Sequence, residues 1–92
     1  MNNLAEIRII VARVSDLLAE AGNQNWLSAF QKFSMELNDH PARAIAQIIS
    51  VYGGMGSFND IVLYEDGQPN TAWNVELDAL REALYRLCRS QI

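Results

Sequence analysis

The sequence lacks the features that mark secreted and membrane proteins. It has one cysteine, Cys88, among 92 residues, so no disulfide bond can form within the chain. No apolar run exceeds four residues, whereas a membrane-spanning helix needs roughly 20. The amino terminus has no basic stretch followed by an apolar run, as a signal peptide would have. We therefore expect a soluble, cytoplasmic chain that forms one domain over residues 1–92 and has no membrane partner.

Positive charge is also scarce, because seven Lys and Arg residues stand against 11 Asp and Glu residues. The formal net charge is −4, which argues against nucleic acid and anionic membranes as partners. Arg81, Arg86 and Arg89 gather on one predicted helix, where they suit the negative end of its dipole. Half of the residues are apolar, so the chain can bury a core.

Apolar residues recur at spacings of three and four in four segments, which predicts four helices. The first is expected at about residues 3–21 and to end at Gly22, a residue that readily adopts positive φ. Pro41 suits the first turn of the third helix. Thr71 or Asn74 is expected to cap the fourth helix.

The composition changes between the third and fourth predicted helices. Residues 53–57 hold three of the five glycines and favour a tight turn, with Phe58 as a plug in the core. Residues 61–64 are β-branched, apolar and aromatic, which predicts a short strand. Because a lone strand leaves its backbone unpaired, we expect it to pair in a hairpin, for example with residues 68–71, or with a second chain. The predicted fold class is mainly α: about four helices in a small bundle, with a glycine-rich turn and a short β element between helices three and four.

Side chains for metal binding and catalysis are few. A structural zinc site needs about four N or S ligands, and the chain has one histidine, His40, and one cysteine. Residues 65–67 lack the alternating oxygen ligands of a calcium loop. Either Asn59 or Asp60 is expected to bond neighbouring backbone amides and fix the turn, and Asp60 has no evident acid–base partner. We expect no metal, no cofactor and no enzymatic activity.

Residues 52–60 read Tyr-Gly-Gly-Met-Gly-Ser-Phe-Asn-Asp and continue into an apolar run. This stretch resembles a signature of a family of small bacterial proteins of unknown function, which also have a leading helical segment and a closing helix like residues 74–87. The resemblance implies that residues 53–60 form a signature turn, and it brings no activity or catalytic residue. The residues assigned to the structural turn are Gly53, Gly54, Gly56, Ser57, Phe58 and Asn59.

Small size, acidity and few catalytic groups favour a binding protein, specifically an inhibitor or immunity protein that neutralises a bacterial toxin by direct contact. An acidic surface would speed its encounter with a basic toxin domain. The expected contact residues are Met55, Asp60, Tyr64, Glu65, Asp66, Glu36 and Asp39.

Two alternatives stay open. A self-associating structural or regulatory module could bury the strand at residues 61–64 in a homodimer. It could also bury a leucine seam formed by Leu77, Leu80, Leu84 and Leu87. A small-ligand binder or enzyme that uses the loop at residues 53–60 is less favoured, because no acid–base pair or nucleophile accompanies the loop.

Overall fold

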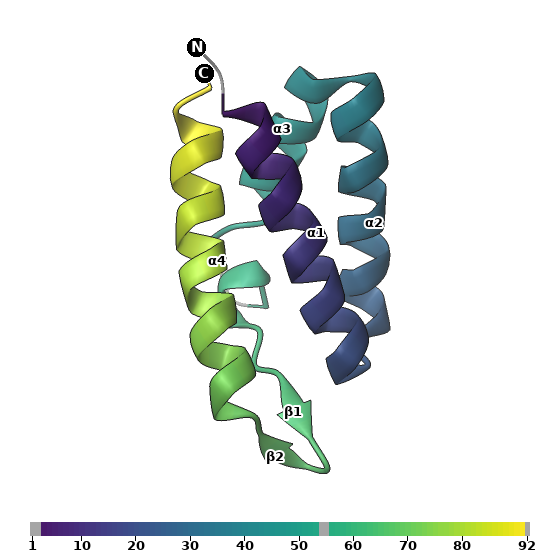
Figure 1. Ribbon diagram of the computed structural model, residues 1–92, viewed down its shortest axis with the longest axis vertical. Helices are drawn as coiled ribbons and strands as arrows, with labels where there is room; N and C mark the ends of the chain where they lie inside the picture. The colour runs from purple at the N-terminus through teal and green to yellow at the C-terminus, as the bar shows by residue number, and fades with distance from the viewer. Residues whose placement is uncertain (1–2, 54–55, 92) are drawn as a thin grey trace.

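Residues 3–53 and 56–91 are described in the computed structural model, and within these ranges the chain forms four α-helices. They are α1 (Leu4–Ala21), α2 (Gln24–Asp39), α3 (Pro41–Ser50) and α4 (Thr71–Arg89). α1 packs against α2 and α4, and α3 packs against the same two helices, so the bundle closes on itself (Figure 1). The predicted mainly α fold, with a short β element between α3 and α4, is confirmed. No helix in the described ranges is long and apolar enough to cross a membrane.

Local signals set the helix ends. Gly22 ends α1 at φ 74°, a left-handed conformation that an L side chain would strain. Pro41 is the first residue of α3, as predicted. The cap of α4 is Asn70, whose side-chain oxygen accepts a hydrogen bond from the Trp73 amide at 2.9 Å. The prediction of Thr71 or Asn74 as the cap is therefore wrong, because the extended backbone that a cap requires falls at Asn70.

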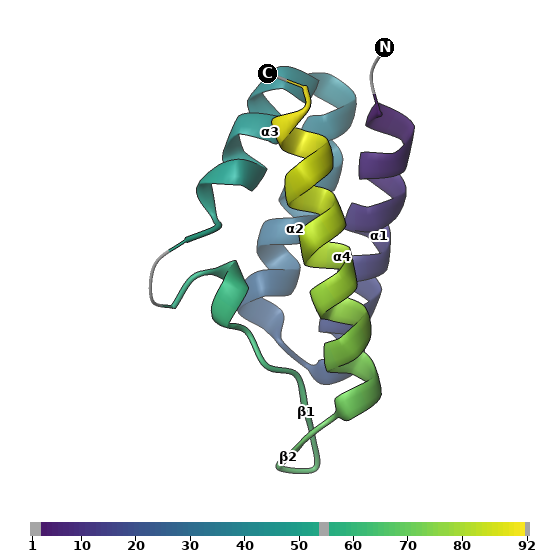
Figure 2. The ribbon, with the colours of Figure 1, turned by 90° about the vertical axis from the view of Figure 1, so that its left-hand side faces the viewer.

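α3 is too short to cover the whole length of the bundle. Its 10 residues span about 15 Å, whereas the 19 residues of α4 span about 28 Å. Figure 2 shows the chain after α3 descending along α4 through a single 3₁₀ turn, η1 (Phe58–Asp60). This segment buries Phe58, Ile61 and Leu63 against the core. The predicted role of Phe58 as a core plug is confirmed, and irregular backbone takes the place of the missing turns of α3.

The β element is shorter than predicted. β1 (Tyr64–Glu65) pairs antiparallel with β2 (Gln68–Pro69), so only the last residue of the predicted 61–64 strand is paired in a sheet. The backbone of the preceding residue, Leu63, is hydrogen-bonded to the side chain of Asn74. The Leu63 N–H donates to Asn74 Oδ1 at 2.7 Å, and the Leu63 carbonyl accepts from Asn74 Nδ2 at 3.0 Å. The amide of Asn74 thus does for Leu63 what a neighbouring strand would do.

We expect Asn74→Ala to lower the free energy of unfolding by about 1–3 kcal/mol, because the buried Leu63 N–H loses its acceptor, whereas the Leu63 carbonyl keeps the bond from the Asn70 amide at 2.9 Å. Asn38→Ala, at an exposed position of α2, is the matched control and should change stability by less than about 0.5 kcal/mol. Urea denaturation of both variants measures the difference. Equal effects would show that the amide contributes nothing specific.

A surface ion pair joins the first and last helices. Arg13 binds Glu76 through two hydrogen bonds, Nε to Oε2 at 2.5 Å and Nη2 to Oε1 at 2.8 Å. The hydrogen bonds from Arg13 lower the pKa of the Glu76 carboxyl below its ordinary value. Because a forked guanidinium fits a carboxylate in one geometry, the pair helps to fix the register of α1 against α4.

The leucine seam of α4 faces the chain's own core. Leu77 and Leu84 are fully buried, and Leu80 and Leu87 pack against the same cluster. The strand that could have paired with a second chain is likewise held within this one. The alternative of a homodimer, which stays a prediction, therefore needs a different surface.

Cys88 is fully buried beside this seam, and burial raises the pKa of its thiol to about 11. Since an unfolded thiol titrates near 8.5, the folded protein holds roughly 300-fold less thiolate at neutral pH. We expect Ellman's reagent to react about 100-fold or more slowly with the folded protein than with the urea-unfolded chain. Equal rates in the two states would contradict the buried position.

Candidate functional site

The glycine-rich loop is closed by its own hydrogen bonds. The Phe58 amide donates to the Val51 carbonyl at 3.0 Å, which joins the two ends of the loop. Asp60 Oδ2 accepts from the Gly56 amide at 2.7 Å, and Ser57 Oγ accepts from the Asn59 amide at 3.3 Å. The predicted stabilisation of the turn by Asp60 is thus confirmed.

Positive φ occurs at two of the predicted turn glycines, Gly53 at 89° and Gly56 at 76°. These positions need glycine because an L side chain is strained there. Two further predicted residues, Gly54 in the turn and Met55 among the partner contacts, lie outside the described residues.

Arg81 of α4 holds the segment that follows the loop. Its side chain is only 12% exposed, and Nη1 donates to the carbonyls of Phe58 at 2.8 Å and Ile61 at 3.1 Å. Nη2 donates to the Asp78 carboxylate one turn earlier. The guanidinium carbon also lies 5.9 Å from the centre of the Phe58 ring. The assignment of Arg81 to the helix dipole is therefore incomplete, because this side chain folds back onto the loop.

An aromatic cluster surrounds Phe58 on the inner side of the loop. Its ring centre lies 4.7 Å from that of Phe30 and 5.4 Å from those of Trp26 and Tyr52. Tyr52 in turn lies 4.9 Å from Tyr85 of α4. The cluster thus runs from the buried core to the surface and ends in two tyrosines.

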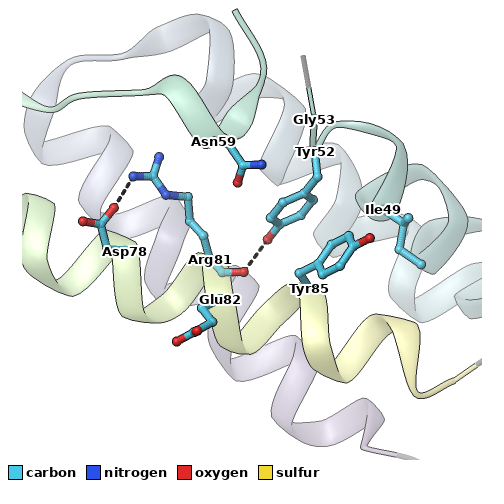
Figure 3. A pocket seen from close by; sticks show the side chains of 8 residues that line it. All are labelled: Ile49, Tyr52, Gly53, Asn59, Asp78, Arg81, Glu82 and Tyr85. Atoms are coloured by element: carbon cyan, nitrogen blue, oxygen red, sulfur yellow. Dashed lines mark hydrogen bonds and ion pairs between the residues drawn. The ribbon is translucent and has the colours of Figure 1, made fainter. Parts of the chain in front are cut away.

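A groove with a volume of about 570 Å³ opens where this cluster reaches the surface, between the end of α3, the loop and α4 (Figure 3). The Tyr52 hydroxyl donates to the Arg81 carbonyl at 2.8 Å, and burial raises the pKa of this phenol, so it stays protonated at neutral pH. Within the described part of the chain, no ion pair or hydrogen bond engages the side chain of Glu82. The lining residues are Ile49, Tyr52, Gly53, Asn59, Asp78, Arg81, Glu82 and Tyr85.

The structure brings some of the predicted contact residues together and separates others. Asp60, Tyr64, Glu65 and Asp66 are exposed on the segment that runs along the first half of α4. Glu36 and Asp39 lie in the last turn of α2, at the end of the bundle opposite the hairpin (Figure 1). The prediction grouped these two residues with the other four by charge alone. Because α2 runs away from the hairpin, its last turn lies far from them.

Most of the groove residues on α4 were missed as functional candidates. Asp78, Arg81, Glu82 and Tyr85 recur at spacings of three, one and three, so they share one face of the helix. That spacing was the available signal. It could not show that this face meets the loop after α3.

The chemistry available here is recognition of a cation. Ring faces and a free carboxylate attract positive charge. Over residues 3–53 and 56–91, no three His, Cys, Asp or Glu side chains converge on a position that could hold a metal ion.

A family model for a domain of unknown function, DUF6966, matches residues 19–71. The chain belongs to this family. The predicted membership of a family of unknown function is therefore confirmed. The DUF6966 segment runs from the end of α1 to the start of α4, so it includes the loop and the Tyr52 wall of the groove, whereas Arg81 and Tyr85 lie beyond it. Comparison with curated proteins and with solved structures gives no match.

Proposed function

We propose that this DUF6966 protein is an inhibitor, such as an immunity protein, that neutralises a bacterial toxin by direct contact with a basic toxin domain. One observation carries the proposal: the exposed Tyr64 is followed directly by the exposed acids Glu65 and Asp66, and the exposed Asp60 precedes it on the same segment, which Arg81 and Asn74 fasten to α4. An exposed tyrosine among acidic side chains on a rigid support suits a binding surface, because little conformational entropy is lost on association.

The charge of the chain supports the same partner. A net charge of −4 on a small protein attracts a basic surface over distances of about 10 Å, and it raises the association rate at low salt. The proposal includes a bacterial cytoplasm as the place of action, which suits a chain with one buried, free cysteine. It also includes residues 52–60 as the signature turn of the family, where two glycines at positive φ and the Phe58 plug fix the loop.

The test is neutralisation of a toxin encoded by the gene adjacent to this one. We expect co-expression of the protein to restore growth of cells that produce the toxin, and the purified pair to form a complex. Glu65→Gln with Asp66→Asn removes two charges while keeping a hydrogen-bond acceptor for Asn70 and a residue that tolerates positive φ. This double variant should associate about tenfold more slowly at low salt.

The matched control is Asp16→Asn with Glu20→Gln on α1, which removes the same charge from exposed positions elsewhere. It should leave the association rate within about twofold of the unmodified protein. Failure to restore growth, or an equal loss in both double variants, would overturn the proposal.

A further inference from the structure

The groove beside the glycine-rich loop is separate from the β1–β2 hairpin, which carries Glu65 and Asp66. We infer that this groove receives an arginine side chain of the partner protein. This inference rests on the proposed function, since it names how the toxin would be held. It concerns the two tyrosines and the free carboxylate that line the groove.

Two rings give the groove its aromatic walls. The Tyr52 and Tyr85 rings are inclined to each other by 53° with centres 4.9 Å apart, and both line the groove (Figure 3). Tyr52 is fixed by the hydrogen bond from its hydroxyl to the Arg81 carbonyl. Tyr85 is 39% exposed, so part of its surface is open to a ligand. Aromatic ring faces attract cations, and arginine stacks on them more often than lysine does.

Charge selects a cation as the occupant. Arg81 is already neutralised by Asp78 and occupied by two loop carbonyls. Glu82, four residues after Asp78, has no such partner in the described ranges; its carboxylate lies at the outer edge of the groove, on the side of α4 away from Asn59 (Figure 3), and gives the lining a net negative charge. A cation of the partner can therefore pair with the Glu82 carboxylate without breaking an existing ion pair.

The shape of the site favours a guanidinium over an ammonium group. A guanidinium is planar, so it can stack on a ring and still donate two parallel hydrogen bonds to a carboxylate. The Asn59 side chain on the opposite wall offers a further carbonyl acceptor, as its place in Figure 3 shows. The groove is open, whereas small-molecule sites enclose most of their ligand, so a side chain presented by another protein suits it.

The test is a titration of the isolated ¹⁵N-labelled protein with N-acetyl-arginine methylamide, followed by NMR. We expect weak, saturable amide shifts confined to the lining of the groove, at Tyr52, Asn59, Glu82 and Tyr85. N-acetyl-citrulline methylamide, which has nearly the same shape without the charge, should bind at least fivefold more weakly. The capped lysine analogue should also bind more weakly than the capped arginine.

Variants assign the binding to the proposed groups. Glu82→Gln and Tyr85→Ala should each weaken binding of the capped arginine at least fivefold. Glu20→Gln makes the same change as Glu82→Gln, and Met35→Ala also truncates a large exposed side chain; both positions lie away from the groove and should leave binding unchanged. Circular dichroism confirms that all four variants are folded.

Several results would overturn the inference: scattered shifts without saturation, equal binding of arginine, lysine and citrulline, or equal binding by the groove and control variants. The titration contains no toxin, so its failure leaves the inhibitor proposal standing. In a toxin complex, the inference predicts at least tenfold weaker affinity for Glu82→Gln. A toxin that is neutralised normally by both groove variants would contradict the groove while upholding the inhibitor.

Discussion

Replacing Phe58 with alanine should lower the free energy of unfolding by about 3–5 kcal/mol. The side chain is fully buried, and its ring contacts three other rings as well as the guanidinium of Arg81. It fills the part of the core that the short α3 leaves uncovered. Since a chain of this size has about 5–14 kcal/mol in total, the variant should lose a large fraction of its stability.

Thermal and urea denaturation measure this effect, with two variants for comparison. Phe58→Leu keeps most of the buried volume and should cost about 1–1.5 kcal/mol. Tyr64→Ala removes an aromatic side chain that is 52% exposed, six residues along the same segment, and should cost less than about 1 kcal/mol. A Phe58→Ala protein as stable as Tyr64→Ala would show that Phe58 does not fill the core.

Replacing Arg81 with methionine should lower the free energy of unfolding by about 2–3 kcal/mol. Methionine keeps much of the apolar stem, so the loss reports on the guanidinium. Without it, the Ile61 carbonyl loses its donor, and the Phe58 carbonyl keeps only a long bond of 3.5 Å from the Ile61 amide. The bond to Asp78 adds little, because that carboxylate is 66% exposed.

Arg86→Met is the matched control for this second prediction, since Arg86 is an exposed arginine on the same helix. It should change stability by less than about 0.5 kcal/mol. Arg81→Lys should fall between the two variants, because a single ammonium nitrogen cannot serve both the two carbonyls and Asp78, which the guanidinium binds through two separate nitrogens. Equal stability of Arg81→Met and Arg86→Met in urea would remove Arg81 as the anchor of the loop.

The helices could be predicted from the sequence because their signals are local. An apolar stripe repeats with the helical period wherever a helix packs on a core, and Gly22 and Pro41 mark helix ends through their own backbone preferences. The strand at residues 61–64 was predicted too long for a related reason. Its pattern shows a buried extended segment, but it does not show that the partner of Leu63 is the side chain of Asn74.

The candidate site was predicted only in part, because it joins segments far apart in the sequence. Asp60 and Tyr64 are four residues apart on one segment, so their grouping needed only the sequence. The contact between Tyr52 and Tyr85 spans 33 positions and depends on how α4 is rotated against the loop. Charge and composition do not encode that rotation, and they likewise could not show that Glu36 points to the far end of the bundle.

The irregular segment between α3 and β1 tolerates insertions and deletions in its first part but not in its second. Val51 and Phe58 are already joined by a hydrogen bond, so residues inserted between them would only enlarge a closed loop, at an entropic cost that grows slowly with length. Between Phe58 and Leu63 the buried side chains follow a fixed spacing, three residues through η1 and two beyond it, and losing one residue there would turn Ile61 or Leu63 toward water. Natural insertions and deletions in related chains should therefore collect at the glycines and spare the five residues that follow Phe58.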